Sequence, residues 1–232
     1  MMRLDKFLAH AGCGTRKDVK KYIHLGVVLV NDVPVRKIDM SVDEVNDKIS
    51  INGKTIEYIN KIYIMINKPD GVISASTDSS QETVVDLVPE YKHLGIFPIG
   101  RLDKDTVGLL ILSNDGDLAH RLLSPTKHVE KEYYVEVNHP IDDKLVNYFA
   151  YGVVLEDGYK SKGAKLFEIN KNKCHVILTE GKYHQIKRMF KMFDYEVTFL
   201  ERIRFKDIVL DSKLKRGEYR LLSSSEIGGL IE

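Results

Sequence analysis

The chain contains 232 residues, of which 43% are hydrophobic and 30% are charged. This composition predicts a folded globular protein and excludes a chain that is disordered throughout. At roughly 100 to 200 residues per domain, the length predicts one or two domains. Because 35 Lys and Arg residues face 34 Asp and Glu residues, the formal net charge is only +1, which excludes a protein that is basic over its whole surface.

Short segments of the sequence argue against two further classes, membrane-spanning proteins and exported proteins. The longest run without Asp, Glu, Lys or Arg is Leu145–Leu155, 11 residues, whereas a membrane helix needs about 18 or more apolar residues. Charges near the start interrupt the apolar region that a signal peptide needs, so we expect a cytoplasmic protein.

The two cysteines, Cys13 and Cys174, form no C-x-x-C pair, which fits a reducing compartment and argues against a zinc site. We expect both thiols to be buried.

The charge is unevenly distributed along the chain. Residues 1–37 contain eight basic and three acidic side chains, a local charge of +5, and residues 182–220 contain eleven basic and six acidic side chains, again +5. An excess of acidic residues between them masks both basic ends in the total. The distribution therefore leaves two candidate surfaces for an anionic partner.

The first sixty residues predict a small domain of two helices and short strands. Apolar residues recur with helical spacing from Leu4 to Ala11, and Thr15 is a candidate N-cap for a second helix that ends near Gly26. Val27–Val30 and Val33–Val35 predict strands about a turn, and Asn52-Gly53 predicts a hairpin. We place this domain at residues 1–58 and a linker at 59–61.

The predicted second helix carries a basic face that is suited to phosphate groups. Its members are spaced at i, i+3, i+4 and i+7, and two arginines lie nearby. The candidate RNA-binding residues of this domain are Arg3, Arg16, Lys17, Lys20, Lys21 and His24.

Residues 62–232 predict an α+β domain, with a mixed, mainly antiparallel sheet flanked by helices. The apolar runs Ile62–Asn67 and Gly108–Ser113 are typical of strands covered on both faces. The first two of the predicted helices given below are stopped by Pro89 and near Pro125. Further strands are expected at 131–137, 164–169, 174–179 and 196–205, and helices at 83–88, 115–123, 142–151 and 184–193.

A charged loop, Gly100–Gly108, interrupts two apolar segments and could present a reactive carboxylate from a rigid scaffold. Asp103 and Asp105 could equally be turn or cap residues. The glycine spacing of Gly95–Gly100 resembles a phosphate-binding loop, but Arg101-Leu102 follows where Lys and Ser or Thr are required, so we reject nucleotide hydrolysis. Asp103 and Asp105 could bind magnesium with Asp115 and Asp117, although the latter pair is better explained by helix capping.

Two other segments carry unusual polar residues. In Lys131–Val137, strand alternation places Tyr133 on the same face as Lys131, either as an ordinary strand aromatic or as a stacking surface for a nucleobase. In Glu180–Phe190, Ile186 and Met189 belong to a core stripe, and the basic residues around it could form a solvated face or bind RNA.

Together these segments resemble one family. The signature of the RsuA-type ribosomal RNA pseudouridine synthases is similar to the segment FPIGRLDKDTVGLLILSNDGDL. Three further motifs of that family resemble other segments of this chain, YIMINKPDGVISAS, HVEKEYYVEV and EGKYHQIKRMF, and the motifs follow the order found in the family. The segment RLDKFLAHAGCGTRKDVKKYIHLGVVLVND is similar to the alpha-L RNA-binding domain that precedes these synthases.

The resemblance implies a role for individual residues. Asp103 takes the position of the catalytic aspartate, supported by Arg101, by Tyr133 at the target base and by Lys187 beside the carboxylate. Lys187 departs from the Arg of many synthases, and the Tyr-His-Gln tripeptide favours RsuA over large-subunit relatives. The basic segment adds four candidate RNA-binding residues, Lys182, His184, Gln185 and Arg188.

The implied function is isomerisation of uridine to pseudouridine in ribosomal RNA, at the single 16S rRNA site of the RsuA subgroup, uridine 516. The implied enzyme is an RNA-modifying isomerase of ribosome biogenesis that flips its target base and uses no cofactor and no metal. We expect a cytoplasmic monomer that acts on 16S rRNA within a small-subunit assembly intermediate. The alternatives are a 23S rRNA synthase, a catalytically silent RNA-binding assembly factor, and a metal-dependent nuclease.

Overall fold

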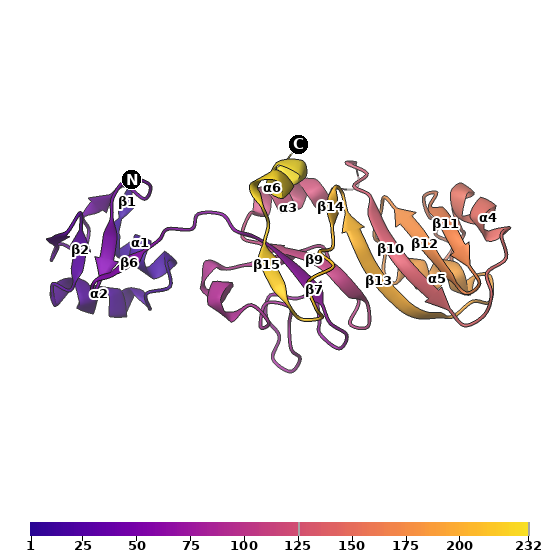
Figure 1. Cartoon of the computed structure of the whole chain (residues 1–232), viewed down its shortest axis with the longest axis horizontal. Helices are drawn as coiled ribbons and strands as arrows, with labels where there is room; N and C mark the ends of the chain where they lie inside the picture. Colours follow the sequence, from indigo (N-terminus) through magenta and orange to yellow (C-terminus); the bar gives the residue numbers. More distant parts are fainter. Residues whose placement is uncertain (125, 232) are drawn as a thin grey trace. The chain divides into compact units, whose positions relative to one another are not determined.

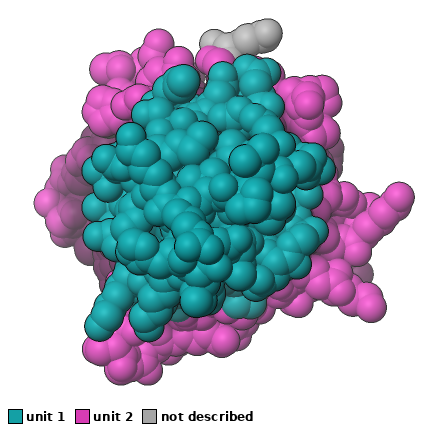
Figure 2. All heavy atoms as spheres, turned by 90° about the vertical axis from the view of Figure 1, so that its left-hand side faces the viewer, with its two compact units in different colours: residues 1–62, 89–96 teal, residues 63–88, 97–232 magenta. Residues whose placement is uncertain are grey.

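The computed structural model describes residues 1–124 and 126–231. The chain divides into two compact units, residues 1–62 with 89–96 and residues 63–88 with 97–232. Figure 1 traces the elements, and Figure 2 colours the two units separately. Among the described residues, no helix has the length and apolar character to cross a membrane.

The first unit packs two helices against a small sheet. Helices α1 (Leu4–His10) and α2 (Arg16–His24) are followed by a four-stranded antiparallel sheet in the order β3-β2-β5-β6. Its strands are β2 (Val28–Val30), β3 (Val33–Pro34), β5 (Ile49–Ile51) and β6 (Lys54–Ile56), while β1 (Met2–Arg3) pairs with β4 (Ser41–Val42). The core contains apolar residues from both helices and the sheet, among them Leu4, Phe7, Leu8, Val19, Ile23, Val28 and Ile49.

Local signals explain these elements. The predicted N-cap of α2 is confirmed: Thr15 and Asp18 form a reciprocal capping box. The predicted hairpin is also confirmed, with Asn52-Gly53 joining β5 to β6. Cys174 is fully buried, whereas Cys13, which was also predicted to be buried, is only partly buried in the turn between α1 and α2, where it packs against the core of the first unit.

The second unit is built on a nine-stranded mixed sheet (Figure 1). Seven strands run in the order β11-β12-β10-β13-β9-β7-β15, with β14 added to β13 and β8 added to β9. Every pair is antiparallel except β13 with β9, which confirms the predicted mixed, mainly antiparallel sheet. The strands are β7 (Tyr63–Lys68), β8 (Phe97–Ile99), β9 (Val107–Ser113), β10 (Lys131–Val137), β11 (Lys165–Asn170), β12 (Lys173–Leu178), β13 (Val197–Phe205), β14 (Ile208–Val209) and β15 (Tyr219–Leu221).

The helices flank this sheet. They are α3 (Gly116–Leu123), α4 (Leu145–Tyr151), α5 (Gln185–Lys191) and α6 (Ser224–Ile231). A 3-10 helix, η1 (Pro89–Leu94), belongs to the first unit. Apolar residues of α3 and α6 share one core with β7 and β9, including Leu118, Leu122 and Leu230. Both helices lie together beside the β7–β9 part of the sheet (Figure 1).

The predicted helix at residues 83–88 is wrong. The structure has turns there, with the Thr83 hydroxyl donating to Asp86 at 2.8 Å, and Thr83 pairs with Ile73 in an isolated bridge. The segment offers only six residues before Pro89, and Val84 and Val85 are β-branched, so too few good helix formers are available to nucleate a helix.

Candidate active site

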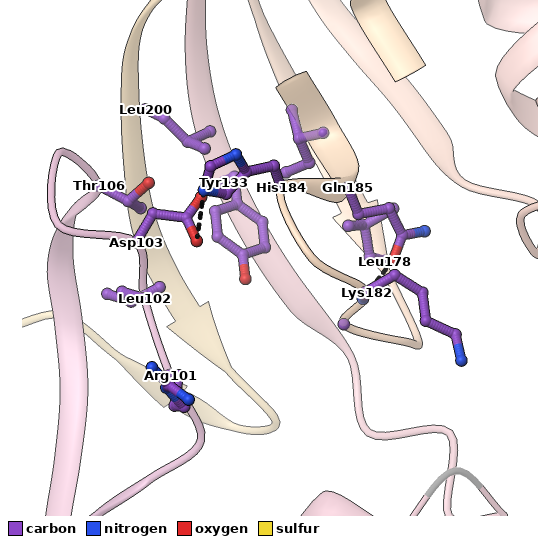
Figure 3. A pocket seen from close by; sticks show the side chains of 12 residues that line it. Arg101, Leu102, Asp103, Thr106, Tyr133, Leu178, Lys182, His184, Gln185 and Leu200 are labelled. Atoms are coloured by element: carbon purple, nitrogen blue, oxygen red, sulfur yellow. Dashed lines mark hydrogen bonds and ion pairs between the residues drawn. The ribbon is translucent and has the colours of Figure 1, made fainter. Parts of the chain in front are cut away.

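The loop that carries Asp103 joins β8 to β9. Leu102 is buried and anchors the loop, while the Asp103 side chain remains 28% exposed. The backbone N–H of Thr106 donates to the Asp103 carbonyl at 3.1 Å and closes a tight turn before β9 begins at Val107. This turn aims the Asp103 carboxylate into a cavity of about 80 Å³ whose side chains are drawn in Figure 3.

The end of β7 and the segment that follows it hold the backbone of this loop. Lys68 is fully buried, and its Nζ donates to the carbonyls of Pro69, Lys104 and Thr106 at 3.1, 3.0 and 2.8 Å. The Ser74 hydroxyl donates to the Leu102 carbonyl at 2.8 Å and accepts from the Leu102 N–H at 3.0 Å. Burial lowers the pKa of Lys68 to about 8, but three carbonyl acceptors fit its ammonium form. These contacts fix the backbone on both sides of Asp103.

Two basic side chains from the α5 region face the Asp103 carboxylate. His184 Nε2 lies 3.6 Å from Oδ1, and Lys187 Nζ lies 3.8 Å from Oδ2. The predicted pairing of Lys187 with Asp103 is therefore present, but Lys187 makes its shorter contact, 2.5 Å, with Asp105. Asp105 is 68% exposed and does not line the cavity. Partial burial raises the pKa of Asp105, but the hydrogen bond and charge of Lys187 outweigh it, so the net pKa is lowered.

Tyr133 forms a wall of the same cavity. It lies on β10, and its neighbours at alternate positions, Val135 and Val137, are buried on the same face as predicted. The side chain is only 9% exposed, and Figure 3 shows its ring pointing into the cavity near Asp103. Arg101 also lines this cavity, but its side chain is exposed. An aromatic ring and a carboxylate thus border one space, together with Leu178 and Leu200.

The turn before α5 is held by a buried carboxylate, Glu180. Its Oε1 accepts from Gln185 Nε2 at 2.6 Å and from the Lys162 N–H at 2.9 Å, and its Oε2 accepts from the Tyr159 hydroxyl at 2.8 Å. Gln185 Oε1 in turn accepts from the Lys182 N–H at 2.9 Å. This network shapes the rim of the cavity from within the protein.

The same network engages Gln185, which the sequence offered as a candidate RNA-binding residue. Gln185 is 4% exposed and its amide is bonded to Glu180 and Lys182, so it positions the turn and offers little to RNA. Arg188 is likewise engaged, with Glu156 at 3.0 Å and Asp157 at 2.6 Å. Lys182 is exposed, and His184, which caps α5 with a left-handed backbone (φ 46°), lines the cavity. Of the four candidates in this segment, Lys182, His184 and Gln185 line the catalytic cavity, and the amide of Gln185 is already bonded within the protein.

The candidate RNA-binding residues of the first unit are exposed. Arg16, Lys17, Lys20, Lys21 and His24 all lie on α2 and reach solvent. Arg3 differs, because its guanidinium donates to both oxygens of the buried Asp5 carboxylate, at 3.0 and 3.1 Å. Five of the six residues therefore form one basic helix surface, and the charge of Arg3 is largely compensated.

Asp115, part of the predicted magnesium alternative, has a structural role. Its Oδ1 accepts from the Leu118 N–H at 3.2 Å, which caps α3, and its Oδ2 accepts from the Tyr63 hydroxyl at 2.7 Å. Burial and this carboxylate raise the pKa of Tyr63 to about 12. Within residues 1–124 and 126–231, no group of three or more His, Cys, Asp or Glu side chains is placed to hold a metal ion.

Sequence reasoning did not single out Lys68, Ser74 or Glu180. A signal existed for Lys68, because a lysine that ends a buried strand and precedes Pro-Asp-Gly is unusual and needs internal acceptors. Ser74 and Glu180 also lie in segments that resemble family motifs, but nothing in the sequence assigned either residue a role. Their partners, Leu102 and Gln185, are apparent only when the chain is folded.

Comparison with known proteins defines the class. Residues 62–192 match the model of the RNA pseudouridylate synthase family, and residues 2–49 match the S4 domain. A solved structure described as a pseudouridylate synthase superposes with a TM-score of 0.71 at 34% identity, covering 99% of this chain and all of the other. The chain therefore belongs to the RNA pseudouridine synthase family and is an isomerase.

Relatives that align over the full length of this chain indicate its subgroup within the family. The uncharacterized RNA pseudouridine synthase YtzG of Bacillus subtilis is 45% identical over all of this chain and 99% of its own length. The ribosomal small subunit pseudouridine synthase A of Haemophilus influenzae is 35% identical, with full coverage of both chains. The dual-specificity RNA pseudouridine synthase RluF of Salmonella typhi is 36% identical over 99% of this chain and 78% of its own length. Within its family, the chain is of the RsuA type and acts on RNA.

Proposed function

We propose that this protein converts a single uridine of 16S rRNA, uridine 516, to pseudouridine within a small-subunit assembly intermediate. The observation that carries the proposal is the placement of Asp103, whose carboxylate enters a cavity bordered by the Tyr133 ring and faced by His184 and Lys187. Similarity over the full length to small-subunit synthases supports the choice of rRNA. The protein would act as a cytoplasmic monomer.

The reaction requires no net oxidation, hydrolysis or added group. The N1–C1′ bond of the target uridine breaks, the uracil turns, C5 bonds to C1′, and the proton on C5 is lost while N1 gains one. The Asp103 carboxylate acts either as the nucleophile at C1′ or as the base at C2′. Both routes need its carboxylate form, and the Lys187 ammonium lies 3.8 Å from that carboxylate. No step in this sequence calls for a metal or an organic cofactor.

The target base must leave its stack to reach Asp103, at a cost of a few kcal/mol. Tyr133 then holds the detached uracil against its ring while the uracil turns, since base stacking on an aromatic side chain is not specific for one orientation. Arg101, exposed at the mouth of the cavity, contacts the RNA around the flipped nucleotide. The basic surface of α2 binds phosphates elsewhere on the rRNA.

The test is to map pseudouridine in 16S and 23S rRNA from cells that lack the gene and carry either wild-type or variant protein. Wild-type protein should restore one pseudouridine in 16S rRNA, and Asp103→Asn should restore none, because an amide can neither attack C1′ nor remove a proton. Asp117→Asn is the matched control, since Asp117 is exposed on α3 and does not line the cavity, and it should restore the modification.

Other outcomes would reject parts of the proposal. A restored site in 23S rRNA would identify a large-subunit enzyme. Modification by Asp103→Asn would remove Asp103 from the chemistry. Identical maps with and without wild-type protein would indicate a silent assembly factor.

A further inference from the structure

A second, larger cavity lies beside the catalytic one. It has a volume of about 460 Å³ and shares Arg101, Tyr133, Gly181 and Lys182 with the catalytic cavity. Among the described residues that line it, five side chains are cationic and a single one is a carboxylate. The cations are Arg101, Lys131, Lys162, Lys182 and Arg202, and the carboxylate is Glu180.

Arg202 gives this cavity a buried guanidinium. It lies on β13 directly opposite Tyr133 of β10, and it is only 2% exposed. Its Nε donates to the Leu109 carbonyl at 2.8 Å, which fixes the side chain, but its Nη2 has no hydrogen-bond partner among the described residues. A buried N–H donor without an acceptor costs about 1 to 3 kcal/mol. Such a donor at a cavity wall indicates a missing acceptor.

Lys131 adds a second cation on the same face of the sheet. Its Nζ donates to the Val129 carbonyl at 2.9 Å, and burial together with the charge of Arg202 lowers its pKa to about 8. The carboxylate of the cavity wall, Glu180, is already occupied by Gln185, Tyr159 and the backbone of Lys162. Arg202 and Lys131 are two positive charges that are partly removed from water, and the hydrogen bonds of the nearby Glu180 are already used by other groups. This arrangement is unfavourable, and a bound anion would compensate the charges of both cations.

We propose that this cavity is a phosphate subsite, in which Arg202 and Lys131 bind a backbone phosphate of the RNA strand next to the flipped uridine. The inference rests on the proposed function, because the shared wall of Arg101 and Tyr133 places the phosphate beside the base cavity. A guanidinium fork matches phosphate oxygens, and an ammonium adds a point charge. The subsite would hold the nucleotide by its backbone while the uracil turns, independently of base identity.

The experiment measures two quantities on the full chain, for wild-type protein and for the variants Lys131→Gln and Arg202→Gln. The first is binding of pyrophosphate without RNA, followed as the rise in thermal unfolding temperature at constant ionic strength. The second is the slope of log affinity against log salt for substrate rRNA. Lys165→Gln, which removes an exposed charge of β11 outside the cavity, is the matched control.

Pyrophosphate should stabilise the wild-type and Lys165→Gln proteins but neither cavity variant. Each cavity variant should also lower the magnitude of the salt slope by about 0.7, the value for one phosphate of a single strand. Cavity variants that bind pyrophosphate and RNA like wild-type protein would overturn the subsite. If pyrophosphate binding is lost and the RNA slope is unchanged, the cavity takes a free phosphate compound and the RNA assignment is wrong. If Arg202→Gln does not fold, Lys131→Gln decides the question.

The two proposals can fail separately. Pyrophosphate binding that depends on Lys131 would support the subsite even if no pseudouridine is formed. Pseudouridine formation with unaffected slopes in the cavity variants would retain the enzyme and remove the subsite.

Discussion

Gly108 lies where the catalytic loop enters β9, beside the backbone of β13. Its φ of 98° lies in the region that favours glycine, and a Cβ at this position would overlap the Arg202 carbonyl oxygen. Two separate features therefore require glycine at this position: its positive φ, and the close approach of the parallel strand β13. Gly108 thus brings the loop that carries Asp103 against the backbone of Arg202.

We predict that Gly108→Ala destabilises the protein by more than about 2 kcal/mol, because a backbone shift must accompany the new methyl group. Gly158→Ala is the control. Gly158 also has a positive φ, 81°, but a Cβ added there would meet nothing within 4 Å, so only the conformational cost of about 1 to 2 kcal/mol applies. Urea unfolding of both variants measures the difference, and equal losses would contradict the steric explanation.

Single residues also show the limits of sequence reasoning at the site. The pairing of Lys187 with Asp103 follows from the family resemblance, whereas the shorter contact with Asp105 depends on how α5 lies against the loop. Gln185 looked like a polar residue on a basic helix, yet the buried Glu180 takes its amide. Such assignments depend on which polar groups folding brings together, and residue type and spacing do not determine that.

At the scale of elements, periodicity and caps predicted most strands and helices of the second unit. The strand at Lys131–Val137 has the predicted bounds, and α3 begins after its predicted Asp115 cap. The predicted helix at 83–88 failed because the segment before Pro89 is short and rich in β-branched residues, which disfavour helix nucleation. The pairing of β13 with β9 was not predictable, because these strands are separated by more than eighty residues and no local signal selects parallel neighbours.

The C-terminal helix α6 depends on an ion pair with β15. Arg220 donates to both oxygens of Glu226 at 2.8 Å, and Glu226 also accepts from the Ser223 N–H at 2.7 Å. The Arg220 hydrogen bond is the main cause that lowers the pKa of Glu226 to about 2 from 4.5. The contribution of Glu226 to stability is therefore complete above pH 4.5 and is lost as the pH falls toward 2.

We predict that Glu226→Gln lowers the free energy of unfolding by about 1 to 2 kcal/mol at pH 7, after allowance for solvent screening of a partly exposed pair. The difference from wild-type protein should shrink as the pH falls from 4.5 to about 3. Thermal or urea unfolding over this range measures it, with Glu196→Gln, an exposed glutamate just before β13, as the control. A difference that stays constant with pH would mean that the carboxylate charge is not the cause.

At the scale of the whole molecule, the net charge of +1 conceals how the basic residues are used. The basic residues of α2 are exposed on one helix. The basic residues from Lys182 onward are divided between cavity walls and ion pairs with acidic side chains of the same unit, such as Arg188 with Glu156. The sequence predicted two basic regions, and the structure gives them different surroundings. Only the first resembles an open electrostatic surface.

We predict that the double variant Lys17→Gln, Lys20→Gln weakens rRNA binding and reduces the magnitude of its salt slope by about 1 to 2, since each lost phosphate contact contributes about 0.7 to 0.9. Stability should be unchanged, because both side chains are exposed and the Thr15–Asp18 capping box is retained. Lys37→Gln with Lys54→Gln removes the same charge from exposed positions off α2 and should change the slope less. Equal effects of the two double variants would mean that total charge, not the α2 surface, governs binding.

The parallel pairing of β13 with β9 also has a consequence for how the enzyme matures during synthesis. The elements matched to the S4 domain lie within the first 49 residues and make local contacts, so they can fold early as the chain emerges. The catalytic loop gains the two basic side chains that face Asp103, His184 and Lys187, more than eighty residues later, and its neighbour Arg202 nearly one hundred residues later. A partly synthesised chain would thus be able to bind RNA before it could isomerise a uridine. Catalytic activity requires that the last strands of the sheet, including β13, have formed.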